Sequence, residues 1–312
     1  MARHTIAVVG IGKISQDQHL PVIAKNPAFD LVAVVSQRGV PVGDVPTFRT
    51  QAELFEAFPD LDAVANCVPP AVRPALVHEA LAAGKHVLIE KPPAATISEF
   101  DDMVAQADRA GRVLFATWHS QFNAAVTRTR DILGREGVKS IRIDWRESVR
   151  KWHPGQDWVW APGGFGVCDP GINALSILTA ITPMPVFVGK AVLRVPANRQ
   201  TPIDVEITFK TNDPDGPTIS AGFNWLEESG EIWSLAIETA TGRKLQLEAG
   251  GTRLIEDGKV TVEEPSMEYE AIYERFDALL QSGQSDTHGT PLRLMADAFL
   301  VGERISVEPF DW

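Results

Sequence analysis

The stretch that decides the fold lies near the start of the chain and reads Thr5-Ile6-Ala7-Val8-Val9-Gly10-Ile11-Gly12-Lys13-Ile14-Ser15. An apolar, largely β-branched run leads directly into a turn that matches G-x-G-x-x-G except at its last position. The first glycine permits a tight bend, the second lets the backbone approach a pyrophosphate, and the following helix presents free N–H groups to negative charge. Ser15 is small enough to keep helix and strand close. We therefore predict a dinucleotide-binding turn that uses Gly10, Ile11, Gly12, Lys13 and Ile14.

The first 120 residues alternate between apolar runs and segments with helical character. Runs without polar alternation are typical of strands buried on both faces of a parallel sheet. Ser98 is a candidate N-cap, and Gly84 and Gly111 follow segments that should end as helices. The pattern predicts an α/β Rossmann dinucleotide-binding domain over residues 1–120. The expected strands are 5–9, 31–36, 61–67, 86–90 and 112–117, and the expected helices are 18–25, 51–58, 73–83 and 98–110.

The pattern changes after about residue 121, where segments with strand character follow one another with turn signals between them. We predict a second, α+β domain over residues 121–312, with a large, mainly antiparallel sheet. Its expected strands are 140–149, 186–195, 204–210, 218–225, 232–239 and 244–248, and its expected helices are 123–133, 269–280 and 291–301.

Composition excludes several classes of partner. With 29 Lys and Arg against 41 Asp and Glu, the net charge is −12, which argues against nucleic acid or an anionic membrane as the main partner. Two cysteines provide no disulfide framework, and the apolar run at the N-terminus is too short for a signal peptide, so we expect a cytoplasmic protein. The histidines lack the spacing of zinc ligands, and no metal is predicted.

The end of the second predicted strand bears on the choice of cofactor. It reads Ser36-Gln37-Arg38 and lacks the acid that would hold the ribose hydroxyls of NAD. Ser36 and Arg38 could instead bind a 2′-phosphate, which favours NADP and leaves NAD possible; the alternative is that Arg38 is a solvated surface residue. Val68 and Pro69 end the next strand and are expected beside the nicotinamide ribose, unless the prolines only shape the turn.

The fourth predicted strand ends in Glu90-Lys91-Pro92-Pro93. Ligands of such sheets lie at the carboxyl ends of the strands, so Glu90 and Lys91 are expected at the cofactor and Lys91 also at the reacting atoms. A strand-end lysine that only reaches solvent is the alternative interpretation, and the two following prolines make it less attractive.

These motifs, together with Gly163-Gly164 and Asp169-Pro170-Gly171-Ile172-Asn173, resemble the Gfo/Idh/MocA oxidoreductases along essentially the whole chain. Phe115–Ser120 and Trp152–Gln156 narrow the resemblance to its sugar 1-dehydrogenases. This implies that an aldose such as L-arabinose or D-galactose is oxidised at its anomeric carbon to a lactone, with hydride transfer to NAD(P)⁺. It also implies that the second domain serves substrate binding and oligomerisation, that the protein forms a homodimer or homotetramer, and that a final helix, 291–301, returns to the first domain. The rivals are another sugar, polyol or dihydrodiol dehydrogenase of the family, and a non-catalytic nicotinamide-binding sensor.

The usual signature of the family ends in a histidine where this chain has Asn173, which cannot take a proton at ordinary pH. Asp169 is therefore the expected general base, with Lys91 stabilising charge on the same oxygen and His153 as the second candidate base. Asn173 lies four residues on and would share a helix face with Asp169. The alternative for Asp169 is an N-cap, with Pro170 in the first helical position.

The resemblance also supplies a set of expected sugar-binding residues. Aromatic faces and fixed polar groups suit a sugar, and any single tryptophan is more often part of a core. For Trp158 and Trp160 we favour packing of the loop, and for His119 a site role and a hydrogen-bonded structural role are equally open. The set implied by the resemblance is His119, Glu147, Trp152, His153 and Trp233.

Overall fold

The computed structural model describes residues 3–312 and divides the chain into two compact units. The first unit comprises the chain up to Trp118 together with Tyr269–Gly289, and the second comprises His119–Glu268 and Thr290–Trp312. Within the described residues, no helix combines the length and the apolar character that crossing a bilayer requires.

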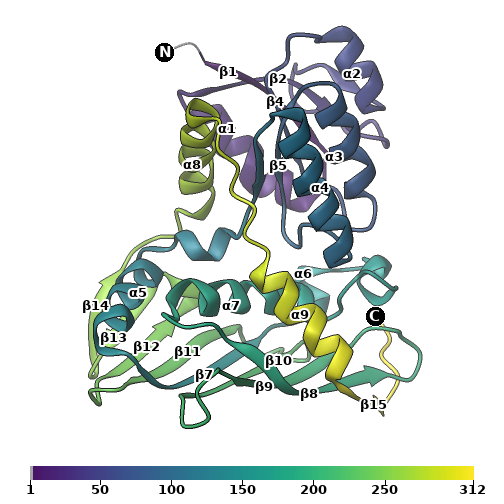
Figure 1. Cartoon of the computed structure of the whole chain (residues 1–312). Helices are drawn as coiled ribbons and strands as arrows, with labels where there is room; N and C mark the ends of the chain where they lie inside the picture. Colours follow the sequence, from purple (N-terminus) through teal and green to yellow (C-terminus); the bar gives the residue numbers. More distant parts are fainter. Residues whose placement is uncertain (1–2) are drawn as a thin grey trace. The chain divides into compact units, whose positions relative to one another are not determined.

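The first unit is built on a six-stranded sheet in the order β3-β2-β1-β4-β5-β6, in which every neighbouring pair is parallel (Figure 1). Its central strands are fully buried because apolar residues occupy both faces. The strand order reverses between β1 and β4, and the carboxyl ends on either side of such a reversal form the ligand-binding edge. The strands are β1 (His4–Val9), β2 (Phe29–Val35), β3 (Thr47–Phe48), β4 (Ala63–Asn66), β5 (His86–Ile89) and β6 (Leu114–Ala116).

Helices cover both faces of this sheet. One face carries α2 (Gln51–Ala57), α3 (Arg73–Ala82) and α4 (Ile97–Ala110), and the other carries α1 (Leu20–Lys25) and most of α8 (Glu268–Ser282) (Figure 1). Phe276 of α8 stacks on Phe29 at 5.8 Å and on Phe115 at 6.2 Å between ring centroids. The expectation that helix 291–301 returns to the first domain is therefore wrong, and α8 is the late helix that does so, because its aromatic face completes this core.

Local signals place most element boundaries of the first unit, with three corrections. Helix α4 is capped by Thr96, not Ser98: the Thr96 side chain accepts the N–H of Glu99, whose carboxylate accepts the N–H of Thr96. The short strand β3 was not expected. The first helix begins earlier than predicted, as a π-helical turn over Ser15–His19.

The second unit contains a nine-stranded sheet in the order β14-β13-β12-β11-β7-β10-β9-β8-β15. It is antiparallel except where β7 pairs with β10 and β8 with β15, so the predicted fold class is confirmed. The strands are β7 (Val138–Arg146), β8 (Phe187–Pro196), β9 (Asp204–Lys210), β10 (Thr218–Asn224), β11 (Ile232–Thr239), β12 (Lys244–Glu248), β13 (Arg253–Glu256), β14 (Lys259–Glu263) and β15 (Glu303–Val307).

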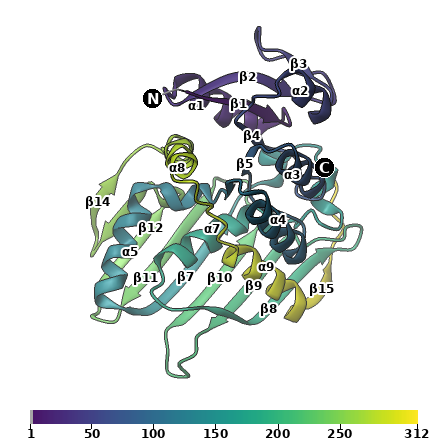
Figure 2. The ribbon, with the colours of Figure 1, turned by 45° about the horizontal axis from the view of Figure 1, so that its top comes forward.

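Three helices cover one face of the second sheet: α5 (Ala124–Glu136), α7 (Cys168–Ile181) and α9 (Thr290–Val301) (Figure 2). Helix α7 is the most deeply buried and lies against β10, where a Cβ on Gly171 would come within 2.6 Å of the Phe223 ring. The glycine of the Asp-Pro-Gly motif therefore sets how closely α7 approaches the sheet. Strands β13, β14 and β15 were not predicted, because they are short and charged, as strands at or near a sheet edge commonly are.

Candidate active site

The glycine turn after β1 has the geometry that a pyrophosphate cradle needs. Gly10 adopts φ of +92°, and a Cβ there would lie 2.8 Å from Cγ1 of Val68, so only glycine fits. A Cβ on Gly12 would meet no atom within 4 Å, which leaves the backbone of the turn approachable. Ser15 is buried and donates its hydroxyl to the carbonyl of Gly12 at 2.8 Å. These residues fit a dinucleotide.

The other residues expected in this turn differ in exposure. Ile11 is buried beneath the turn, whereas Ile14 is exposed at the start of the helix. Lys13 is also exposed and pairs with Asp17 one turn further on. The side chains of Lys13 and Ile14 are therefore exposed to solvent at this turn, whereas the side chain of Ile11 is part of the core.

The loop after β2 carries the three polar residues that the sequence analysis expected at the cofactor. Ser36 is buried, and its hydroxyl oxygen accepts the N–H of Val40 at 3.0 Å, so it shapes the loop. Gln37 and Arg38 are exposed. Arg49, which the sequence analysis missed, donates to the carbonyl of Gln37 at 2.7 Å and packs its guanidinium over Gly39. Two arginines therefore border this loop.

The loops after β4 and β5 are tied together by a buried arginine. Arg73, at the start of α3, donates to the carbonyl oxygens of Val68, Glu90 and Pro92. It therefore fixes Val68 beside Gly10 and holds the segment that carries Lys91. Pro69 lies in the same turn. Sequence reasoning missed Arg73 because its partners lie up to 19 residues away.

In the second unit, the structure brings several predicted residues into contact through one buried carboxylate. The Glu147 carboxylate accepts the indole N–H of Trp233 at 3.0 Å and that of Trp225 at 3.2 Å. Trp152 packs on Trp233 with ring centroids 5.7 Å apart. Glu231 accepts the indole N–H of Trp152 at 3.1 Å. Trp152 and Trp233 are both partly exposed, so each has a face that a ligand could reach.

The cluster continues to the predicted general base. His153 lies 5.2 Å from Trp225 between ring centroids, and its Nε2 is 3.6 Å from Oδ2 of Asp169. Asp169 is the second residue of α7, whose N-cap is Val167, so the capping interpretation of Asp169 is wrong. Asn173 lies in the same helix and, four residues on, on the same face as Asp169.

The remaining tryptophans of the loop differ from one another. Trp160 is buried and packs against Trp225 and Phe310, as expected for a packing residue. Trp158 is partly exposed and meets His153 edge-on at 6.3 Å.

His119 is oriented by a carboxylate that the sequence analysis did not single out. Its Nδ1 is 2.8 Å from Oε2 of Glu268, and the other oxygen of Glu268 accepts the side-chain N–H of Asn123 at 2.8 Å. Burial favours the neutral carboxyl of Glu268, but His119, Ser120 and Asn123 outweigh it and lower its pKa. A residue 149 positions away in sequence thus fixes the ring of His119.

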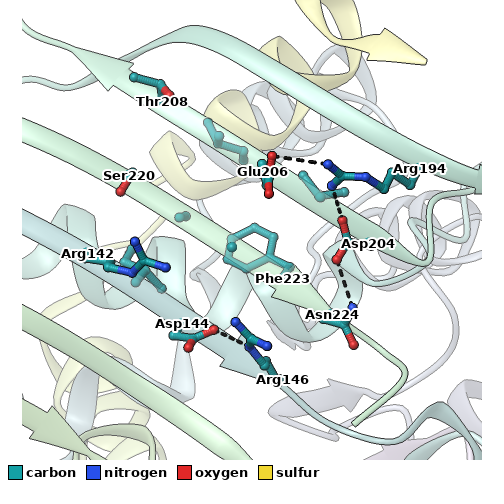
Figure 3. A pocket seen from close by; sticks show the side chains of 15 residues that line it. Arg142, Asp144, Arg146, Arg194, Asp204, Glu206, Thr208, Ser220, Phe223 and Asn224 are labelled. Carbon is teal, nitrogen blue, oxygen red and sulfur yellow. Dashed lines mark hydrogen bonds and ion pairs between the residues drawn. The ribbon is translucent and has the colours of Figure 1, made fainter. Parts of the chain in front are cut away.

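A hollow of about 500 Å³ lies on the face of the second sheet opposite α7 (Figure 3). Its charged side chains largely pair with one another: Arg146 with Asp144 at 2.6 Å, and Arg194 with Asp204 and Glu206. None of the predicted site residues lines it. Among residues 3–312, no group of three or more His, Cys, Asp or Glu is arranged to hold a metal ion.

Known proteins resemble this chain in both sequence and fold. Residues 4–117 match the GFO_IDH_MocA model, described as an oxidoreductase family with an NAD-binding Rossmann fold. Galactose 1-dehydrogenase of Pseudomonas fluorescens is 47% identical over 310 residues, with 98% of each chain covered.

Solved structures extend this likeness to the whole fold. The crystal structure of a D-galactose-1-dehydrogenase protein from Rhizobium etli has a TM-score of 0.94 at 46% identity and covers 100% of this chain and 99% of its own. The 3-ketoreductase KijD10 from Actinomadura kijaniata, solved with NADP and TDP-benzene, has a TM-score of 0.85 at 17% identity, covers 98% and 100%, and shares the fold.

Proposed function

Because the chain belongs to the Gfo/Idh/MocA family of oxidoreductases, we propose that it oxidises D-galactose, L-arabinose or a close relative at the anomeric carbon to the lactone. The 47% identity to galactose 1-dehydrogenase over 310 residues supports an aldose as substrate. The observation that carries the proposal is the run of contacts in the second unit from Trp152 through Trp233, Glu147 and Trp225 to the His153–Asp169 pair. It joins aromatic faces suited to a sugar to a buried carboxylate suited to a proton.

Oxidising a hemiacetal to a lactone removes a hydride from C1 and a proton from its hydroxyl. The nicotinamide of the bound cofactor supplies the hydride acceptor. We propose that Asp169 takes the proton, because a carboxylate can act as a general base. His153, at 3.6 Å, orients Asp169 and is the alternative proton acceptor. The Lys91 ammonium then stabilises negative charge that develops on the same oxygen.

The remaining side chains would bind and orient the sugar. In this proposal Trp152 and Trp233 stack against its C–H surfaces, and Asn173 and His119 hydrogen-bond its hydroxyls. Glu147 and Glu268 act through their neighbours: the first holds the indole of Trp233 and the second holds the ring of His119. Each would fix a contact residue in one orientation, which lowers the entropy lost on binding.

For the cofactor we propose a preference for NADP over NAD. The residues directly after β2, 36–39, include no acid, Arg38 is exposed among them, and Arg49 packs over Gly39. Arginine suits a phosphate because its planar fork can donate two hydrogen bonds. The Glu53 carboxylate accepts the backbone N–H groups of Arg49 and Thr50, which engages it away from the arginine side chain.

An initial-rate panel tests the proposed activity. A series of pentoses and hexoses is offered with NAD⁺ and with NADP⁺, absorbance at the reduced-nicotinamide band is followed, and the lactone is identified by mass spectrometry. We expect D-galactose or L-arabinose to give the highest initial rate of cofactor reduction. Turnover of a polyol or a dihydrodiol instead would assign another family activity, and no turnover with any substrate while cofactor binds would leave a nicotinamide-binding sensor.

The cofactor preference has its own test in binding. Arg49→Ala should weaken NADP⁺ about tenfold by calorimetry, the loss of one charge-assisted hydrogen bond, and leave NAD⁺ unchanged. Arg109→Ala, an exposed arginine on α4, is the matched control. An equal loss for both cofactors would contradict a 2′-phosphate role.

The expected cytoplasmic homodimer or homotetramer also stays a proposal. Light scattering coupled to size exclusion measures the oligomeric state.

A further inference from the structure

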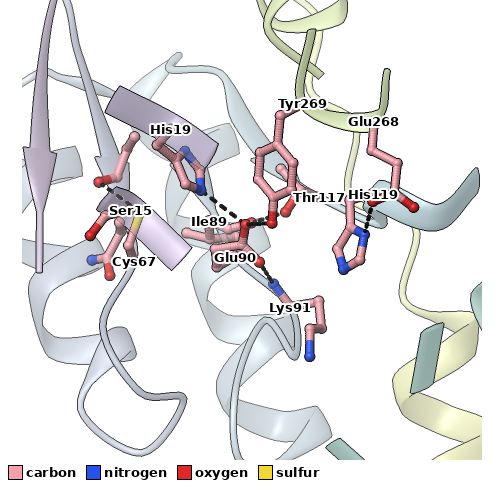
Figure 4. A network of polar contacts seen from close by, with 12 residues as sticks. Ser15, His19, Cys67, Ile89, Glu90, Lys91, Thr117, His119, Glu268 and Tyr269 are labelled. Atoms are coloured by element: carbon pink, nitrogen blue, oxygen red, sulfur yellow. Dashed lines mark hydrogen bonds and ion pairs between the residues drawn. The ribbon is translucent and has the colours of Figure 1, made fainter. Parts of the chain in front are cut away.

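A buried carboxylate, that of Glu90, lies immediately before Lys91 at the end of β5 (Figure 4). Its Oε1 is 2.9 Å from Nε2 of His19 and accepts the hydroxyl of Tyr269 at 2.8 Å. Its Oε2 accepts the backbone N–H of Lys91 at 2.9 Å. The Lys91 side chain points away from this carboxylate, so the contact holds the backbone of Lys91 and leaves its amine to other partners (Figure 4).

Each of these three partners donates. A backbone N–H can only donate, Tyr269 donates its hydroxyl, and His19 must present an N–H to an ionised carboxylate. An ionised glutamate is a pure acceptor and satisfies all three, whereas a glutamine amide would turn its NH₂ group toward at least one donor. An acceptor-only carboxylate therefore suits this site better than the amide of glutamine, which has the same shape.

A buried anion is costly without a partner of opposite charge, and His19 is suited to that role. Its ring is fully buried, with Nδ1 2.8 Å from the hydroxyl of Tyr273 and the Tyr269 ring 5.0 Å away. Burial alone would lower the pKa of His19, but Cys67, Tyr273 and Glu90 facing it raise that pKa well above its usual value. His19 ends the π-helical turn that follows the glycine loop, and such turns are frequent at functional sites.

We propose that Glu90 is a positioning residue for Lys91, and that His19 and Tyr269 hold it in that role. The inference rests on the proposed function only for the claim that Lys91 takes part in the reaction. The proposal gives α8 a second role besides completing the core, because this helix supplies the Tyr269 hydroxyl that donates to Glu90. It also gives the Glu90 carboxylate a role toward the protein, where the sequence analysis expected a contact with the cofactor.

The rival interpretation is that this cluster only stabilises the first unit. Glu90→Gln separates the two, because it keeps the shape of the side chain and replaces one of its two acceptor oxygens with an NH₂ donor. We expect faster exchange of the Lys91 amide proton, followed by NMR on protein labelled with ¹⁵N-lysine and assigned by the signal that Lys91→Arg removes. We expect kcat to fall about ten- to hundredfold, as a displaced catalytic group implies, while Kd for the cofactor and KM for the sugar change little.

The two tyrosines of α8 provide a matched pair if Glu90→Gln fails to fold. Tyr269→Phe removes a hydrogen bond to Glu90, whereas Tyr273→Phe, one helical turn later, removes one on the far side of His19. Both should cost similar stability, about 1 kcal/mol for a buried hydrogen bond. Only Tyr269→Phe should speed Lys91 amide exchange and lower kcat.

Two results would overturn the positioning role. One is a Lys91 amide that stays equally protected in Glu90→Gln and Tyr269→Phe. The other is equal loss of kcat in both tyrosine variants, in proportion to their stability. If the wild-type protein turns over no sugar, the exchange measurement still decides the inference, so its failure is distinguishable from failure of the proposed function.

Discussion

Gly171→Ala is the sharpest test of how the fold positions the proposed base. The new Cβ would lie 2.6 Å from Cδ2 and 2.9 Å from Cε2 of Phe223, closer than real Cβ atoms come. Alanine favours a helix interior over glycine by about 1 kcal/mol, whereas overpacking a core costs roughly 1–3 kcal/mol. Because Phe223 is fully buried and cannot swing away, we expect the upper end of that cost and a net loss of about 2 kcal/mol.

Gly134→Ala in α5 is the control, because this exposed helical glycine has no atom within 4 Å of a new Cβ. It should gain roughly 0.5–1 kcal/mol from helix propensity alone. Urea unfolding of both variants, with Gly171→Ala/Phe223→Leu as the rescue, measures the difference. Gly171→Ala should also lower kcat, because Asp169 lies two residues before it in α7. Stabilisation by Gly171→Ala, or no rescue by the smaller residue at 223, would refute the argument.

Three further outcomes follow from the same contacts. Lys91→Ala and Asp169→Ala should each lower kcat by orders of magnitude with an unchanged melting temperature, and near-normal turnover of Asp169→Ala would move the base role to His153. Glu147→Gln turns an NH₂ group toward one indole N–H, so the KM for the sugar should rise and unfolding should cost about 1–3 kcal/mol less. The folded-state pKa of His19 is raised, so its stabilisation is complete below about pH 6.5 and is lost as pH rises through the folded value. The difference in unfolding free energy between the wild type and His19→Gln should therefore shrink toward alkaline pH, and a constant difference in urea titrations would contradict a charged His19.

Local signals in the sequence were enough for every strand of the first unit's sheet except β3. The turn at Gly10 and the helix stop at Gly111 depend on backbone conformations that neighbouring residues do not change, and both adopt positive φ. Strands β9, β11 and β12 were predicted to the residue, and in β9 and β12 apolar and polar residues alternate strictly. Strands β14 and β15 are short and rich in charged residues, and pairing with their neighbours defines them.

The site residues that sequence reasoning missed share one property. Arg49, Arg73, Glu268 and Tyr269 each act on a residue that the sequence analysis had named, and the partner lies between 5 and 179 positions away. A motif identifies a group that touches a ligand, because that chemistry limits which residue types can serve. A group that holds such a residue in place can come from any element that passes nearby, so only the fold reveals it. Ser36 can serve both purposes, because its hydroxyl oxygen accepts the N–H of Val40 while its O–H can still donate to a phosphate. The chemistry of the site is therefore readable from the chain, and its rigidity comes from tertiary contacts that α8 and the start of α3 supply.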